Sequence, residues 1–128
     1  GFGAIGELPA PLPLKDLIQR IKLKLGVKWL AVLEGPSEQI TRLAVCGGSG
    51  GELVEAAFQQ GADAFITGEA KYHTFLEYED KLTIITAGHY ATERVILPVW
   101  VERLQKWLGD EPISVIETKM LTNPIKLL

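Results

Sequence analysis

Cysteine is almost absent from this chain of 128 residues, which carries a single thiol, at Cys46. One cysteine excludes an internal disulfide and fits the reducing conditions of the cytoplasm, where we expect the protein to reside. No sequence feature places a base beside Cys46, so we interpret it as a buried structural thiol rather than a nucleophile.

Long apolar runs are also lacking. No stretch approaches the roughly 20 apolar residues that a membrane-spanning helix needs, so we expect no membrane partner. The opening letters, GFGAIGELPAP, have neither the basic region nor the apolar core of a signal peptide. The first residue is glycine rather than methionine, which leads us to expect a fragment of a longer chain.

Positive charge is not in excess, because 13 Lys and Arg residues stand against 16 Asp and Glu residues, for a net charge of −3. This balance argues against non-specific nucleic-acid binding through a basic surface. Apolar residues make up 47% of the chain, which is ordinary for a soluble globular protein, and the length suits one domain over residues 1–128.

Short apolar runs alternate with helical patterns along the chain, after an entry strand or loop at its start. This order predicts an α/β layered domain, a sheet of about five or six mainly parallel strands flanked by helices. The short link between the first two predicted strands predicts an antiparallel hairpin. Pro98 should kink the last helix or separate its first turns. The predicted strands are 27–33, 40–46, 62–67, 81–87 and 111–119, and the predicted helices are 14–25, 52–60, 71–79 and 91–108.

A glycine-rich loop, Gly47, Gly48, Ser49, Gly50 and Gly51, joins the second predicted strand to a helix. Such a loop lets backbone N–H groups approach a phosphate closely, and the serine hydroxyl can bind a phosphate oxygen. The loop lacks the Gly-Lys-Ser/Thr ending of a P-loop. A tight turn that lets the helix pack close to the sheet explains it equally well, so both interpretations remain open.

Two carboxylate–histidine pairs follow buried strands, Glu69 with His73 and His89 with Glu93. Residues four apart on a helix share a face, so each pair can converge on one divalent ion such as zinc, iron or manganese. Both pairs are expected at the carboxyl edge of the sheet, beside the glycine loop. For either pair alone, a surface salt bridge or a helix cap is the commoner explanation.

Neither pair is a complete metal site, because protein metal sites usually have at least three protein ligands. Either all four side chains meet around one ion, or the missing ligands come from elsewhere.

The segments VCGGSGG, ADAFITGEAKYH, AGHYATE and TNP occur in this order, and together they resemble the C-terminal half of the Nif-three-like family. Its members are also labelled GTP cyclohydrolase I type 2 homologues. The opening GFGAIGEL and LPLKDLIQRIK resemble the start of that half, so the likeness spans nearly the whole chain. The resemblance implies two similar α/β halves with a dinuclear metal centre between them, assembled as a ring-shaped hexamer.

The family's Gly-His-x3-Glu element falls on Gly88, His89 and Glu93, which implies that His89 and Glu93 are metal ligands. Its Thr-Gly-Asp/Glu-x-x-Tyr-His element implies that Glu69 and His73 line the same cleft, in a supporting or substrate-binding role. Family members often have an aspartate just before Gly-His, where this chain has Thr86-Ala87. The family's paired-histidine motif lies in the N-terminal half, which this chain lacks.

Two functions follow as expectations. The first is half of a metal-dependent hydrolase for a nucleotide or another phosphate-containing small molecule. In it, His89 and Glu93 hold the ion, Glu69 or His73 moves protons, and Gly47, Gly48, Ser49 and Gly50 receive a phosphate. The second is a non-catalytic metal-binding, oligomerisation or protein-interaction module. The expected partners are the missing N-terminal half and further copies of the chain, and we expect weak or no metal binding and negligible activity from the fragment alone.

Overall fold

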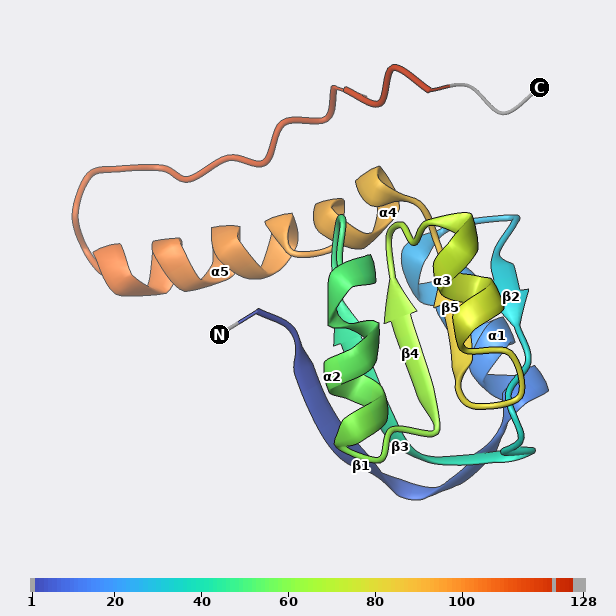
Figure 1. Ribbon diagram of the computed structural model, residues 1–128. Coiled ribbons are helices and arrows are strands. Elements are labelled where there is room, and N and C mark those ends of the chain that lie inside the picture. Colours follow the sequence, from blue (N-terminus) through green and yellow to red (C-terminus); the bar gives the residue numbers. More distant parts are fainter. Residues whose placement is uncertain (1, 121, 126–128) are drawn as a thin grey trace. The chain divides into compact units, whose positions relative to one another are not determined.

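The structure is a computed structural model that describes residues 2–120 and 122–125 (Figure 1). The chain divides into two compact units, residues 1–93 and residues 94–128. The sheet belongs to the first unit, and each unit is described by itself. The prediction of one domain over residues 1–128 stays a prediction.

The first unit is built on a five-stranded sheet with the order β1-β3-β4-β5-β2. The three central strands β3, β4 and β5 run parallel, and the two edge strands β1 and β2 pair antiparallel with their neighbours. The α/β class and the mainly parallel sheet are therefore confirmed. The strands are β1 (Ala4–Pro13), β2 (Ala31–Leu33), β3 (Gln39–Cys46), β4 (Ala64–Thr67) and β5 (Thr83–Thr86).

The predicted hairpin between 27–33 and 40–46 is wrong. β2 is limited to Ala31–Leu33 and pairs with β5, whereas β3 lies between β1 and β4. The link 34–38 connects β2 to β3 and crosses the amino-terminal ends of β5 and β4, as the lower part of Figure 1 shows. Gly35 donates its N–H to Thr83 Oγ1 at 3.0 Å, and the Ser37 hydroxyl donates to Asp63 Oδ1 at 3.1 Å. These contacts hold the link in place across the sheet.

Helices cover both faces of the sheet. Successive residues of a strand point to opposite faces, so they pack against helices on opposite sides. Phe65 and Ile84 pack with α2 and the residues after α3, whereas Ala64 and Ile85 pack against α1. Figure 1 shows α2 and α3 on one face and α1 on the other. The helices of this unit are α1 (Leu14–Leu25), the 3-10 turn η1 (Gly51–Leu53), α2 (Val54–Gln59), α3 (Tyr72–Glu77) and α4 (His89–Arg94, which ends in the second unit).

Proline is accommodated in β1 because this strand lies at the edge of the sheet. Leu12 pairs with Ile40, and the N–H of Leu14 donates to the carbonyl of Glu38 at 3.2 Å. The N–H groups of even-numbered residues at this end of β1 therefore face β3. The nitrogens of Pro11 and Pro13 face away from the sheet.

The second unit contains α5 (Leu97–Leu108), with Pro98 in its first turn. The prediction that Pro98 separates the first turns of a long helix is confirmed, since α4 and α5 are distinct. The predicted strand over 111–119 is wrong, because this segment pairs with no strand among the described residues. Its β-branched residues favour extended backbone, but a strand also needs a neighbour for its hydrogen bonds. Across the described ranges, no helix has the length and apolar content to cross a membrane.

Candidate functional site

Three loops meet at the carboxyl edge of the parallel strands. β3 leads into residues 47–50, β4 into residues 68–71, and β5 into residues 87–88 before α4 begins. Backbone bonds join the loops, because Gly68 donates its N–H to the carbonyl of Gly48 and Gly88 donates to the carbonyl of Gly68, both at 3.0 Å. The structure thus brings the glycine loop and both predicted pairs to one edge, as the sequence predicts.

His89 lies between two carboxylates at this edge. Its Nδ1 is 3.2 Å from Glu69 Oε1, and its Nε2 is 3.0 Å from Glu93 Oε1. The Ser49 hydroxyl donates to Glu69 Oε2 at 3.1 Å and lies 3.5 Å from His89 Nδ1. The side chains of Glu69, His89 and Glu93 are 43–58% exposed, so the cluster is open to solvent.

The cluster has more acceptors than its histidine can satisfy. A neutral imidazole carries one N–H, so it can donate to only one of the two carboxylates that it contacts. One of the two contacts of His89 is made by its own N–H. The other needs a second proton or a cation between the nitrogen and the carboxylate oxygen.

The pair His89 and Glu93 fits two positions around one metal ion. Zinc binds histidine nitrogen and carboxylate oxygen at about 2.0–2.2 Å, so two neighbouring ligands lie about 3.0–3.5 Å apart. The 3.0 Å between Nε2 and Oε1 falls in this range. Glu69 faces the other ring nitrogen, and metal-binding histidines usually donate that N–H to a carboxylate. No group of three or more His, Cys, Asp or Glu side chains in residues 2–120 and 122–125 could itself hold a metal.

His73 does not join this cluster. Glu69 precedes α3, which begins at Tyr72, so Glu69 and His73 do not share a helical face. The His73 side chain is exposed, and within the described part of the chain it forms no hydrogen bond or ion pair. The arrangement in which all four side chains meet is therefore not found: Glu69 contacts His89 instead of His73.

Two N–H groups of the glycine loop are already bonded within the protein. The N–H of Gly48 donates to Thr92 Oγ1, and the N–H of Gly50 donates to Thr67 Oγ1, both at 3.0 Å. Both groups are thus used within the protein. The predicted phosphate contacts of Gly47, Gly48, Ser49 and Gly50 stay a prediction, and of these Ser49 presents an exposed hydroxyl beside Glu69.

Thr92 is a residue of the site that sequence reasoning missed. It lies on α4 between His89 and Glu93, and it reaches back to the glycine loop. A threonine inside a helix gives no signal of its own, because its hydroxyl ordinarily bonds a carbonyl of the preceding turn. Only the fold shows that Gly48 lies within reach.

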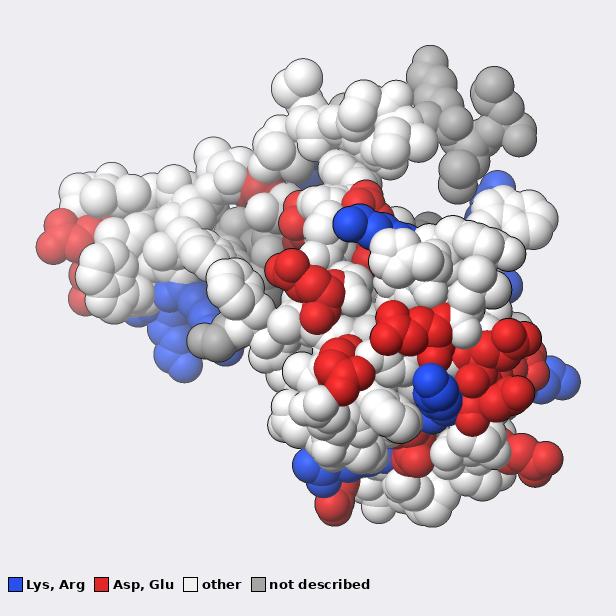
Figure 2. Space-filling model, in the orientation of Figure 1, with Lys and Arg blue, Asp and Glu red and all other residues white. Residues whose placement is uncertain are grey.

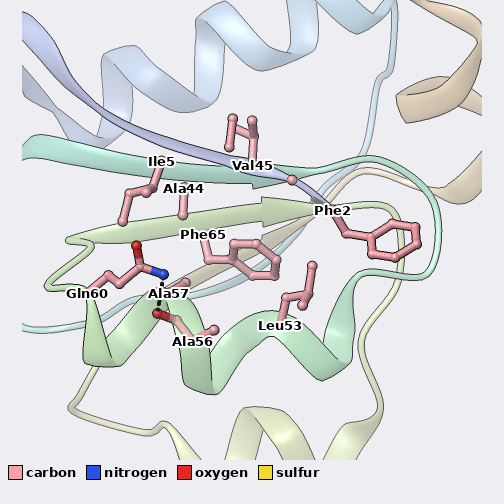
Figure 3. Close-up of a pocket in the computed structure, with 11 residues that line it drawn as sticks. Phe2, Ile5, Ala44, Val45, Leu53, Ala56, Ala57, Gln60 and Phe65 are labelled. Carbon is pink, nitrogen blue, oxygen red and sulfur yellow. Dashed lines mark hydrogen bonds between the residues drawn. The ribbon is translucent and has the colours of Figure 1, made fainter.

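Two other surfaces of the first unit differ in chemistry from this site. A hollow of about 240 Å³ lies between β1, β3 and α2, and among its lining residues only Gln60 has a polar side chain, which donates to the carbonyl of Ala56 (Figure 3). Carboxylates gather over α3 and the turn after it, where Glu77, Glu79 and Asp80 lie close in sequence (Figure 2). The hollow offers no acid or base, and the acidic face would repel a polyanion.

Comparison with known proteins places the chain among relatives about twice as long. Residues 1–124 match the family model described as Duf34/NIF3 (NGG1p interacting factor 3). The GTP cyclohydrolase 1 type 2 homolog of Haemophilus influenzae is 35% identical over 120 residues, 93% of this chain and 46% of that protein. The protein NIF3 homolog of Schizosaccharomyces pombe is 33% identical over 131 residues, 98% of this chain and 46% of that protein. The crystal structure of Staphylococcus aureus protein SA1388 superposes with a TM-score of 0.89 at 32% identity, covering 100% of this chain and 42% of that one.

Proposed function

Since the chain belongs to the Duf34/NIF3 family, we propose that its His89 and Glu93 supply part of a divalent-metal site in a metal-dependent hydrolase. The substrate class is a nucleotide or another phosphate-containing small molecule. One observation carries the proposal: His89 Nε2 lies 3.0 Å from Glu93 Oε1 while Nδ1 of the same ring faces Glu69, so one cation could bind both Nε2 and Oε1.

Each side chain of the cluster has a separate role in this proposal. His89 and Glu93 bind the ion from one face of α4, and Glu69 holds the imidazole by accepting the Nδ1 proton. When bound, the metal acts as a Lewis acid and lowers the pKa of a bound water. The Ser49 hydroxyl steadies Glu69 and is the exposed group that can contact a substrate oxygen. A proton-transfer role for His73 or Glu69 stays a prediction.

Two ligands do not complete a metal site, so we propose that the others come from outside this chain. The chain spans about half the length of the curated relatives that it matches. The remaining half of such a protein is the proposed source, which leaves this chain with weak affinity and negligible activity when it is alone.

Paramagnetic Mn²⁺ tests the ligand assignment, because it broadens NMR signals near its binding site even when binding is weak. We expect signals of His89 and Glu93 to broaden first as Mn²⁺ is added to the chain. His89→Ala and Glu93→Gln should each abolish this selective broadening, because two ligands cannot be reduced to one without losing the site.

His73→Ala is the matched control, since it removes the other histidine and leaves the cluster intact. This variant should show the same Mn²⁺-induced broadening at His89 and Glu93 as the wild type. Retained broadening at α4 in both His89→Ala and Glu93→Gln, or selective broadening at His73, would show that the assigned ligands are wrong.

A non-catalytic assembly module is the second candidate, favoured by the apolar surface of residues 94–128. No residue of α5 is buried, and several large apolar side chains of this unit are more than half exposed. Such a surface is typical of a protein contact, so it fits a homo-oligomer. Assembly that persists in a metal chelator, with no hydrolysis by the full-length protein under any metal, would favour this candidate. The large apolar side chains that are more than half exposed are Trp100, Trp107, Ile113, Ile116, Met120 and Ile125.

A further inference from the structure

The carbonyl of Gly48 is the point where the glycine loop is fixed to the rest of the site. It accepts hydrogen bonds from the Thr67 hydroxyl at 3.2 Å, from the N–H of Gly50 and of Gly68 at 3.0 Å, and from the N–H of Glu69 at 3.2 Å. Thr67 is fully buried. One buried peptide group thus connects the loop after β3 to the backbone that carries Glu69.

The N–H of the same residue fixes the other side of the site. It donates to Thr92 Oγ1 at 3.0 Å, and the Thr92 hydroxyl lies 2.9 Å from the carbonyl of His89 and 3.1 Å from that of Gly88. Through Thr92, Gly48 is attached to the turn of α4 that carries the two proposed ligands. Gly48 therefore ties Glu69 to His89 and Glu93.

A side chain at this position would meet the two proposed ligands. A Cβ on Gly48 would lie 2.5 Å from Glu93 Oε1 and 3.4 Å from His89 Nε2. The φ of Gly48 is +66°, a conformation that residues with a side chain rarely adopt. The carboxylate end of Glu93 is flexible, so an added methyl group would displace this oxygen rather than the backbone.

We propose that Gly48 is a positioning residue of the metal site: held by Thr67 and Thr92, it leaves the space in which the Glu93 carboxylate faces His89 Nε2. The inference rests on the proposed function of His89 and Glu93. It assigns the glycine loop a role in aligning metal ligands.

The comparison of Gly48→Ala with Gly26→Ala tests this role. Gly26 ends α1 with the same φ of +66°, and a Cβ there meets nothing within 4 Å. Both variants place a side chain at the same positive φ, but only in Gly48→Ala does the added Cβ meet Glu93. We expect the Kd for Mn²⁺, measured from the paramagnetic resonance of the free ion, to rise about 10- to 100-fold in Gly48→Ala and to stay at the wild-type value in Gly26→Ala.

Thr92 provides a second, independent pair of variants. Thr92→Val keeps the shape of the side chain but removes the acceptor for the Gly48 N–H, whereas Thr92→Ser keeps the hydroxyl. We expect Thr92→Val to weaken Mn²⁺ binding and to speed hydrogen exchange at the Gly48 amide, with Thr92→Ser restoring both. A purely structural role would lower the thermal stability of Thr92→Val without changing the Kd measured well below the unfolding transition.

Wild-type affinity in both Gly48→Ala and Thr92→Val would overturn the proposal. Absence of Mn²⁺ binding by the wild-type chain alone would agree with the expectation that the other ligands lie outside it, and crystal structures of the metal-free variants then decide the positioning role. A Glu93 carboxylate that moves away from His89 in Gly48→Ala supports it, and an unmoved carboxylate refutes it.

Discussion

Asp63, just before β4, shows how a single carboxylate organises the chain around it. Its Oδ2 accepts hydrogen bonds from the N–H of Thr41 at 2.8 Å, the hydroxyl of Thr41 at 2.7 Å and the N–H of Arg42 at 2.8 Å. The Ser37 hydroxyl donates to Oδ1. Burial by itself raises the pKa of Asp63, but the hydrogen bonds from Arg42, Thr41 and Ser37 outweigh it and hold the pKa below its usual value of 3.8.

We expect Asp63→Asn to lower the free energy of unfolding by about 1–3 kcal/mol at pH 7, because the hydrogen bonds from Thr41 and Arg42 lose a charged acceptor. A pKa that is lower in the folded state means that this contribution is present above the unfolded-state pKa and is lost as the pH falls through the folded-state value. Urea unfolding at pH 7 and at pH 3 or below should show the difference between variant and wild type shrinking with acidity. Asp110→Asn, at an exposed position, is the control, and a deficit that does not depend on pH would contradict the assignment.

The residues of the candidate site were only partly predictable from the sequence. His89 and Glu93 share α4, so their spacing of four gave the correct contact. Glu69 and His73 have the same spacing, but α3 begins three residues after Glu69, and the helical rule does not apply there. The contacts of Glu69 with His89 and of Gly48 with Thr92 join segments 20 and 44 residues apart, which periodicity does not reveal.

At the scale of elements, α2 and the end of α3 are joined by a buried tyrosine. The Tyr78 hydroxyl donates to the Glu55 carboxylate, and the Tyr78 ring packs edge-on against Phe58 at 5.7 Å between centroids. The hydrogen bond to Glu55, followed by burial, raises the pKa of Tyr78 to about 12. The neutral hydroxyl is therefore the form that the fold requires.

We expect Tyr78→Phe to lower the free energy of unfolding by about 1–2 kcal/mol at pH 7, since it removes a hydrogen bond to a charged group and keeps the ring. Because the folded-state pKa lies above the unfolded-state value of about 10, the contribution is complete below pH 10 and is lost as the pH rises towards 12. Chemical unfolding followed at pH 7 and pH 11 measures both effects. Tyr72→Phe, at a residue that is 77% exposed, should be neutral; equal effects of the two variants would refute the role of Tyr78.

Most elements of the fold could be predicted because their signals are local. Helical spacing and Gly26 marked α1, and apolar runs marked β4 and β5. The position of β2 could not be predicted, since pairing depends on where the link 34–38 runs. Three strand spacings of about 4.8 Å separate β2 from β3, a distance that five extended residues can span. A short link therefore permits a crossing as well as a hairpin.

At the scale of the whole molecule, the buried residues are unevenly distributed. Every buried apolar side chain among the described residues lies between Leu17 and Ala87, within the first unit. The second unit contributes none. The information needed to form the core is thus contained in the first 93 residues.

We therefore expect a chain of residues 1–96, which keeps α4 complete, to fold without the rest. Circular dichroism and urea unfolding should show one cooperative transition, and heteronuclear NMR spectra should keep the dispersion of a folded sheet. A peptide of residues 97–125 should show little helix in isolation, because short helices without packing are marginal in water. A shortened chain that is unfolded would refute the expectation.

The outward-facing prolines of β1 bear on how this molecule avoids fibril formation. A sheet edge with free N–H groups is a template for a strand of another molecule. Pro11 and Pro13 have no N–H to offer on the solvent side of β1, and the opposite edge strand, β2, is only three residues long. Both edge strands of the sheet are therefore poor templates for edge-to-edge aggregation, even though the strands between them consist mainly of apolar and β-branched residues.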